Sequence, residues 1–137
     1  MFITRRIDFS ASHVCSSGRL SEEQNRAVYG ETARNHGHNY VLEVTLDGQP
    51  DPVTGMIFDL KKLKEIMNRE VAQPMDHRFL NKEVPPFDRG VVPTPENMAI
   101  EIWRRLAPHF AEGRPRLHAV RLFETEDLFV EYFGEAA

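Results

Sequence analysis

The stretch Asn35-His36-Gly37-His38-Asn39-Tyr40 runs directly into the alternating segment Tyr40-Val41-Leu42-Glu43-Val44-Thr45-Leu46. The alternation of apolar and polar residues predicts a half-buried strand. Residues two apart on a strand project from the same face, so His36 and His38 point the same way, with Cα atoms about 6.7 Å apart. Two imidazoles at that spacing can converge on one ion, although such pairs also occur without a metal. A third ligand has to come from elsewhere in the chain.

The first segment of the chain supplies a third histidine. Ile3, Ile7, Phe9 and Ala11 alternate with polar residues, which predicts an opening strand. The same alternation carries His13 onto the face of Ile7 and Phe9. Three histidines from two strands suit a catalytic zinc site whose fourth position is left to water or substrate. The alternative is a core or surface histidine beside an ordinary strand edge.

Composition indicates one globular domain over residues 1–137, with 41% hydrophobic and 28% charged residues. A formal charge of −4 without a basic run argues against a nucleic-acid partner. The single cysteine, Cys15, excludes an internal disulfide and a thiolate-rich metal site, and it fits a reducing compartment. Residues 1–6 lack the apolar core of a signal peptide, and no apolar run reaches membrane-spanning length. We therefore expect a cytoplasmic protein without a membrane partner.

The middle of the chain predicts a long connection and one helix. Residues 16–34 form a polar connection with a short helix near 22–29. Residues 55–58 predict a brief strand. Apolar residues then recur at helical spacing from Leu60 to Val71, directly after Asp59, which is a good N-cap.

The second half adds a helix and a hairpin. After an irregular segment at 73–81, Thr94-Pro95-Glu96 predicts a second helix that ends before Gly113. Residues 117–124 and 128–133 alternate about a short turn, as a hairpin does. The resulting order is strand, strand, helix, helix, strand, strand. It favours an α+β domain with an antiparallel sheet.

Two further positions carry chemistry. Asp76-His77 places a carboxylate beside an imidazole, which can orient the ring as a proton shuttle, although turn formation explains most adjacent pairs of this kind. Glu124 closes the apolar segment Val120–Phe123. Its two carboxylate oxygens can accept paired N–H groups of a heterocycle, or it can be an ordinary solvated residue at a strand end.

Five motifs, taken in order, give these separate signals one common interpretation. They are Phe9-Ser10-Ala11-Ser12-His13, His36-Gly37-His38-Asn39-Tyr40, Asp76-His77-Arg78-Phe79-Leu80-Asn81, Thr94-Pro95-Glu96-Asn97 and Phe123-Glu124-Thr125. Their order and spacing over almost the whole chain resemble the 6-pyruvoyl-tetrahydropterin synthase family, which includes the bacterial 6-carboxy-tetrahydropterin synthases. The resemblance implies a T-fold (tunnelling fold): a four-stranded antiparallel sheet with two helices packed on one face. It also implies homo-oligomers, trimers or dimers of trimers, with active sites between subunits.

The resemblance also assigns roles by position. The implied zinc ligands are His13, His36 and His38. Glu124 matches the residue that anchors the pterin ring, with Thr94 and Glu96 on the adjoining wall, while Asp76 and His77 match the proton-relay pair. The implied substrate is 7,8-dihydroneopterin triphosphate or a related dihydropterin. Zinc would act on its side-chain oxygens as a Lewis acid in a phosphate-eliminating carbon–oxygen lyase.

One position departs from the family pattern. The family's catalytic base is usually a cysteine shortly before H-G-H, and here Thr32 occupies its place. A threonine hydroxyl is a far poorer base than a thiolate. Glu31 can supply a carboxylate base, Cys15 can fold back from beyond His13, or the reaction differs. The alternatives are a side-chain-cleaving homologue that gives a 6-hydroxymethylpterin and a non-catalytic module that binds zinc and a pterin.

Overall fold

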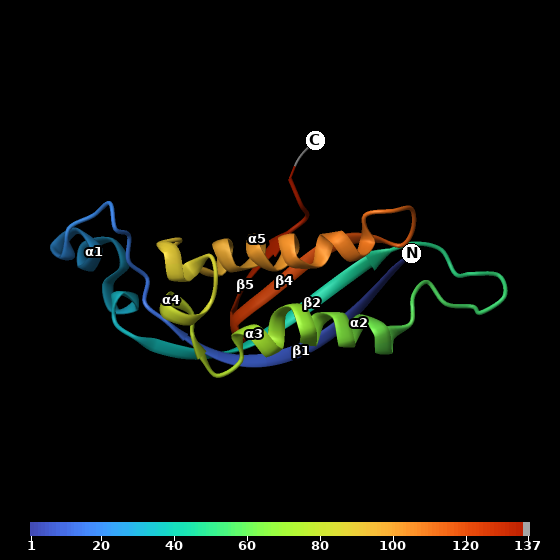
Figure 1. Cartoon of the computed structure of the whole chain (residues 1–137), viewed down its shortest axis with the longest axis horizontal. Helices are drawn as coiled ribbons and strands as arrows, with labels where there is room; N and C mark the ends of the chain where they lie inside the picture. Colours follow the sequence, from blue (N-terminus) through green and yellow to red (C-terminus); the bar gives the residue numbers. More distant parts are fainter. Residues whose placement is uncertain (136–137) are drawn as a thin grey trace.

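A five-stranded sheet in the order β3-β1-β2-β4-β5 frames the protein, whose computed structural model describes residues 1–135 (Figure 1). The strands are β1 (Phe2–His13), β2 (His36–Asp47), β3 (Arg78–Phe79), β4 (Arg116–Thr125) and β5 (Leu128–Tyr132). The two long opening strands and the C-terminal hairpin agree with the alternation in the sequence. The pairs β1–β2, β2–β4 and β4–β5 are antiparallel. The pair β1–β3 is parallel and involves Ala11 and Ser12 of β1.

The predicted four-stranded antiparallel sheet is therefore wrong in strand number and in sheet type. The extra strand, β3, contains two residues and pairs with only two residues of β1, so it has no alternation to recognise. The brief strand predicted at 55–58 is also wrong, because this segment is an irregular loop with a bend at 57–58 that leads to the cap of the next helix.

Helices occupy the connections between the strands. They are α1 (Glu22–Tyr29), η1 (Gly30–Ala33), α2 (Leu60–Met67), η2 (Asn68–Ala72), α3 (Gln73–Met75), α4 (Leu80–Glu83), η3 (Phe87–Arg89), α5 (Pro95–Leu106) and η4 (Ala107–Phe110). Asp59 caps α2 by accepting the Lys61 N–H, and Thr94 caps α5 by accepting the Asn97 N–H at 3.2 Å. The helix predicted from Leu60 continues through the π-helical turn η2 into α3.

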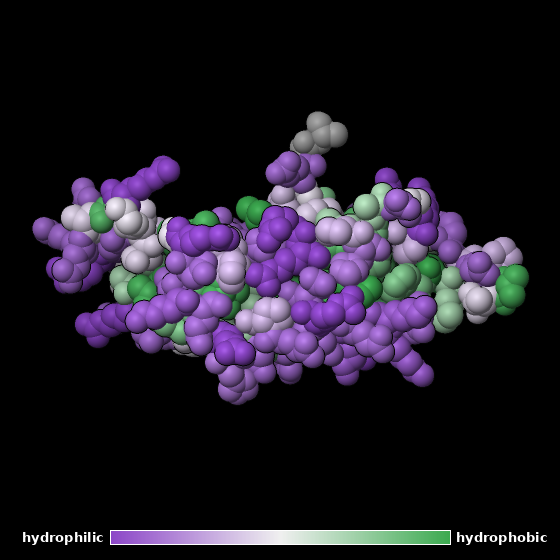
Figure 2. All heavy atoms as spheres, viewed as in Figure 1, coloured by the Kyte–Doolittle hydropathy of each residue, from purple (hydrophilic) through white to green (hydrophobic). Residues whose placement is uncertain are grey.

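The core lies between one face of the sheet and the helices α2 and α5, which cover that face (Figure 1). The alternate residues Ile7, Phe9, Leu42 and Val44 point into this layer, and α5 adds Ile102. The outer surface of the helix layer is mainly hydrophilic (Figure 2). The amphipathic pattern of both helices therefore fixes which face of the sheet becomes the interior.

The opposite face of the sheet carries a row of alternating charges. Arg6, Glu43, Arg121 and Glu131 are register partners on four successive strands, and each is ion-paired with the next. The Arg6 guanidinium also lies 5.5 Å from the ring centroid of Phe123. Opposite charges on directly facing residues stabilise strand pairing. The row ties β1, β2, β4 and β5 together on the face without helices.

Four elements meet at one end of the molecule: the end of β1, the start of β2, the end of β4 and the N-terminus of α5 (Figure 1). The helix α1 and the turn η1, which connect β1 to β2, lie at this same end. The sequence places its chemistry-bearing residues on these termini. The sheet and α5 therefore position the candidate site.

Candidate functional site

Three histidines converge where β1 ends and β2 begins. His13 and His36 are register partners, and His38 lies two residues further on the same face. One nitrogen of each ring lies within 4.8 Å of the other two. His13 is buried, with 1% of its surface exposed. The parity argument from the sequence thus identifies three side chains that share one point in space.

Hydrogen bonds to backbone carbonyls fix the tautomers of two of these rings. The Nδ1–H of His13 donates to the Pro93 carbonyl at 2.7 Å, and the Nδ1–H of His36 donates to the Arg34 carbonyl at 2.6 Å. Each Nε2 is then a lone-pair acceptor, and the two Nε2 atoms face each other at 2.9 Å. The Nε2 of His38 is buried and has no hydrogen-bond partner within residues 1–135. This donor set fits a metal ion that accepts all three nitrogens.

Burial also favours the neutral form of two of these rings, His13 and His38. Desolvation lowers the pKa of His13 to about 4, and the Pro93 carbonyl opposes this shift only in part. Desolvation is also the largest cause of the lowered pKa of His38, while the nearby Glu124 carboxylate raises it. Neutral imidazole is the form that binds metals, so proton competition at this site is weak near neutral pH.

Glu124 projects from the end of β4 toward the same point. Its side chain is 11% exposed, and its Oε1 lies 3.5 Å from the Nε2 of His38. Its Oε2 is buried and has no hydrogen-bond partner among the described residues. A buried carboxylate oxygen without a donor is costly, so the arrangement is suited to a ligand that brings N–H groups.

The N-terminus of α5 forms the adjoining wall. Thr94 uses its hydroxyl oxygen to cap the helix, directly after the Pro93 carbonyl that holds His13. Glu96 lies in the first turn of α5, near enough to Cys15 for its charge to help raise the pKa of that thiol. The structure therefore brings the predicted wall residues next to the histidine cluster.

The three candidates for the missing base occupy different environments. Cys15 is buried, and its N–H donates to the Thr32 carbonyl at 2.9 Å. Burial raises the pKa of the Cys15 thiol, a hydrogen bond with the Thr32 side chain lowers it, and the Glu124 and Glu96 charges raise it further. The Thr32 hydroxyl donates to the Tyr29 carbonyl at 2.6 Å. Glu31 is 90% exposed and lies 3.9 Å from Arg34.

Asp76 and His77 lie at the outer edge of β1. Asp76 Oδ1 accepts the Ser10 N–H at 2.8 Å, the His77 N–H donates to the Ser10 carbonyl at 2.6 Å, and the two side chains are 3.0 Å apart. The Ser10 N–H is the main cause of the lowered pKa of Asp76, followed by the hydrogen bond with His77. His77 adopts φ +59° and is 83% exposed. A non-glycine residue held in that region is uncommon, and such residues cluster at functional sites.

Among the described residues, this pair makes no direct polar contact with the histidine cluster. Within residues 1–135, no hydrogen bond or ion pair joins Asp76 or His77 to the three histidines. His77 nevertheless lines a hollow of about 510 Å³ together with Ser10, Ser12 and Asn39 and with His38 of the cluster. Ser10, Ser12 and Asn39 belong to the face of the sheet opposite the helices, whereas His38 belongs to the face of the histidine cluster.

Three supporting residues escaped the sequence analysis of the site. Pro93 and Arg34 act through backbone carbonyls, which no side-chain pattern reveals. Asn81 both accepts the N–H and donates to the carbonyl of Val14, each at 2.8 Å, and so fixes the residue after His13. Asn81 does stand in the Asp76–Asn81 motif, so the motif was a signal for it.

The family model described as 6-pyruvoyl tetrahydropterin synthase matches residues 2–135. The chain belongs to this family. It is 42% identical over 135 residues to a 6-pyruvoyl tetrahydrobiopterin synthase from Dictyostelium discoideum, which covers 98% of this chain and 97% of the relative. It is 27% identical over 143 residues to a 6-carboxy-5,6,7,8-tetrahydropterin synthase from Rickettsia typhi, which covers 93% and 96%.

A solved structure supports the same assignment. The 6-pyruvoyl tetrahydropterin synthase of Caenorhabditis elegans superposes with a TM-score of 0.90 at 36% identity, covering 98% of this chain and 96% of that one. The strand order and the helix layer described above are therefore those of the synthase family. Among the described residues, no helix has both the length and the apolar character needed to cross a membrane.

Proposed function

We propose that this member of the synthase family is a zinc-dependent lyase that acts on 7,8-dihydroneopterin triphosphate or a related dihydropterin. The observation that carries the proposal is the cluster of His13, His36 and His38 beside Glu124, whose buried Oε2 has no hydrogen-bond partner among the described residues. The chain has a higher sequence identity to the 6-pyruvoyl relative than to the 6-carboxy relative, which favours the phosphate-eliminating, pyruvoyl-forming reaction.

The three histidines would hold the zinc ion, since one nitrogen of each ring converges on the same point and burial lowers the pKa of His13 and His38. When bound, the ion supplies Lewis-acid polarisation of a substrate oxygen. Glu124 would orient the ring, because two carboxylate oxygens match two N–H groups of a pterin. Thr94 and Glu96 would line the side of the ring that faces α5.

Asp76 and His77 would move protons between the pterin ring and its side chain. The carboxylate holds the imidazole at 3.0 Å and orients it. Because no hydrogen bond or ion pair joins this pair to the histidine cluster among the described residues, we infer that it serves a site shared with a neighbouring copy in a trimer or a dimer of trimers. The sheet offers free edges for such an assembly at β5 and along most of β1.

The first proton abstraction is the step for which this chain differs from the family pattern. Thr32, Glu31 and Cys15 stay candidates for the base. The Thr32 hydroxyl is already hydrogen-bonded to its own turn, and Glu31 is open to solvent. These placements keep the side-chain-cleaving reaction to a 6-hydroxymethylpterin as a second candidate. The single-domain, cytoplasmic and zinc assignments stay predictions.

The decisive experiment incubates zinc-loaded protein with 7,8-dihydroneopterin triphosphate and identifies the products by mass spectrometry. Release of triphosphate together with a 6-pyruvoyl product supports the main proposal, and a 6-hydroxymethylpterin supports the second. The variants His38→Ala and Glu124→Gln serve as matched controls for metal and ring binding. Ligand binding without any turnover would instead assign the chain to a non-catalytic pterin-binding module.

A further inference from the structure

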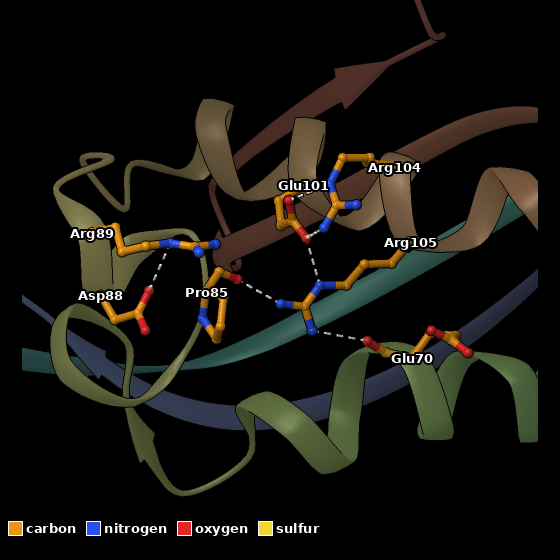
Figure 3. A network of polar contacts seen from close by, with 7 residues as sticks. All are labelled: Glu70, Pro85, Asp88, Arg89, Glu101, Arg104 and Arg105. Atoms are coloured by element: carbon orange, nitrogen blue, oxygen red, sulfur yellow. Dashed lines mark hydrogen bonds and ion pairs between the residues drawn. The ribbon is translucent and has the colours of Figure 1, made fainter.

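The Arg105 guanidinium joins three segments that are distant in sequence. Its Nε donates to Glu101 at 2.6 Å within α5, its Nη1 donates to the Glu70 carbonyl at 3.2 Å, and its Nη2 donates to the Pro85 carbonyl at 2.6 Å. Figure 3 shows the guanidinium between Pro85 on one side and Glu70 on the other. The side chain is 14% exposed. A surface arginine would not normally satisfy three acceptors at once, so this one has a structural task.

The two carbonyls bracket one excursion of the chain. Residues 70–85 leave the helix layer at η2, pass through the Asp76–His77 turn and β3, and return after α4. Within this excursion, Asp76 and His77 bond to Ser10 of β1. Asn81 bonds to Val14, directly after His13. Arg105 therefore holds both ends of the segment that carries the relay pair, while β1 holds its middle.

The buried carboxylate of Glu101 fixes the orientation of the Arg105 side chain. Glu101 is 5% exposed and receives hydrogen bonds from both Arg104 and Arg105. Burial alone raises the pKa of Glu101, but the hydrogen bonds and charges of the two arginines outweigh it and leave that pKa lowered. The Glu101 carboxylate therefore stays ionised. Its hydrogen bond holds the planar guanidinium of Arg105 in the orientation in which it donates to both carbonyls.

We propose that Arg105 is a positioning residue for Asp76 and His77. Its guanidinium, which extends from α5, fixes the position of the turn that carries this pair by holding both ends of residues 70–85. The inference rests on the proposed function for its catalytic readout. The clamp requires the two ends of the excursion to stay at a fixed separation. Without it, the turn keeps its bonds to Ser10 but loses the frame that supports them from α5.

Arg104 provides a matched control. It is bonded to the same carboxylate from the same helix but is 70% exposed and contacts neither Glu70 nor Pro85. We expect Arg105→Met to speed amide hydrogen exchange across residues 70–85 at least tenfold while β2 and β4 stay protected. We expect Arg104→Met to leave that segment near the wild-type rate. In the same pair, kcat should fall by about tenfold or more for Arg105→Met with little change in KM and in bound zinc.

A second variant keeps the test decisive if Arg105→Met does not fold. Arg105→Lys retains the charge beside Glu101 but cannot donate to both carbonyls at once, so it should show the same local exchange in a milder form. Equal exchange in the Arg104 and Arg105 variants would overturn the clamp, and so would an unchanged kcat in an otherwise active enzyme. If wild type turns over no dihydropterin, the exchange experiment still decides the clamp while the proposed function fails separately.

Discussion

Pro93 and Arg34 determine which nitrogen of two histidines is free. Each carbonyl accepts the Nδ1–H of one ring, so the Nε2 atoms of His13 and His36 face each other as acceptors. The sequence could predict the three histidines, because strand parity alone places them on one face. It could not predict the carbonyls, because any residue type supplies one. For the same reason, the roles of Asn81 and Arg105 became visible only when distant segments were brought together.

The buried His13 predicts how the metal-free protein responds to acid. Its pKa is about 4 in the folded protein against an ordinary value of 6.5, so between these values only the unfolded chain gains the proton. The free energy of unfolding of the apoprotein should therefore decline as the pH falls from about 6.5 to about 4. Below about pH 4, His13 should make no further contribution to its pH dependence. Urea unfolding of wild type and His13→Asn across this range measures the effect. Identical pH slopes in the two proteins would count against it.

Glu124 yields a prediction about ligand binding. Glu124→Gln keeps the size of the side chain but removes the charge and replaces one acceptor oxygen with an N–H donor. We expect pterin affinity to fall by roughly tenfold to a hundredfold, because a charged hydrogen bond to a buried partner is lost. Titration calorimetry with a pterin measures this loss. Zinc content should stay at the wild-type level, and a parallel loss of zinc would mean that Glu124 supports the metal instead.

The identity of the catalytic base can also be tested by changing single residues. If the loss of the family cysteine limits the reaction, Thr32→Cys should raise the rate of 6-pyruvoyl product formation. The new thiol would lie beside Cys15, whose N–H already bonds to the Thr32 carbonyl, so the assay needs reducing conditions. A Cys15→Ser background provides the control. A variant that binds zinc and pterin as before but gains no rate would show that the cysteine is not the main difference.

At the level of elements, the long periodic segments behaved as the sequence predicted. The two long strands, the hairpin and the helix after Thr94 have strong periodicity or a clear cap, so local chemistry determines them. β3 and α4 do not, because β3 gains its two backbone pairings only from Ala11 and Ser12, which are far away in sequence. The predicted helix after Asp59 has the right start, but its π-helical turn is a tertiary feature of the packing against α5 and β1.

The cap of α5 gives an element-scale prediction. Thr94 accepts the Asn97 N–H, so Thr94→Ala should cost about 1 kcal/mol of unfolding free energy. Thr94→Ser retains the hydroxyl and should recover most of it. Chemical denaturation of the three proteins compares these values. The helix start also positions the Pro93 carbonyl, so zinc affinity should follow the same order. Equal stability of the alanine and serine variants would rule out the cap as the relevant contact.

At the level of the whole molecule, one chain leaves much of its sheet edge unpaired and exposes aromatic side chains. Phe2, Phe129 and Phe133 are 57%, 44% and 58% exposed. Such edges and side chains are usually covered by another copy. The sequence could not predict this from periodicity, because the alternation of β5 is the same whether its outer edge meets water or a second strand.

Complementation between two inactive variants tests whether sites form between copies. His38→Ala removes one of the proposed metal ligands, and His77→Ala removes the ring of the proposed proton relay. If a site takes its metal from one copy and its relay from the next, mixed assemblies from equal amounts should recover about a quarter of wild-type activity. Co-expression followed by activity assay and native mass spectrometry measures this. Mixed oligomers without activity would place both functions in one chain.

The register of β1 and β2 has a consequence for how the protein acquires its metal. His13 and His36 are paired residues of two hydrogen-bonded strands. The strand pairing already holds them together, so an ion bound between them adds no new connection between distant segments. In a zinc finger the metal is the condition for folding. Here the three histidines already lie together in the folded chain, so loading of the proposed zinc ion should be a later, reversible exchange. A chelator should strip the ion while far-ultraviolet circular dichroism stays unchanged. Cobalt should then enter the same rigid pocket, where its absorption spectrum would report tetrahedral coordination directly.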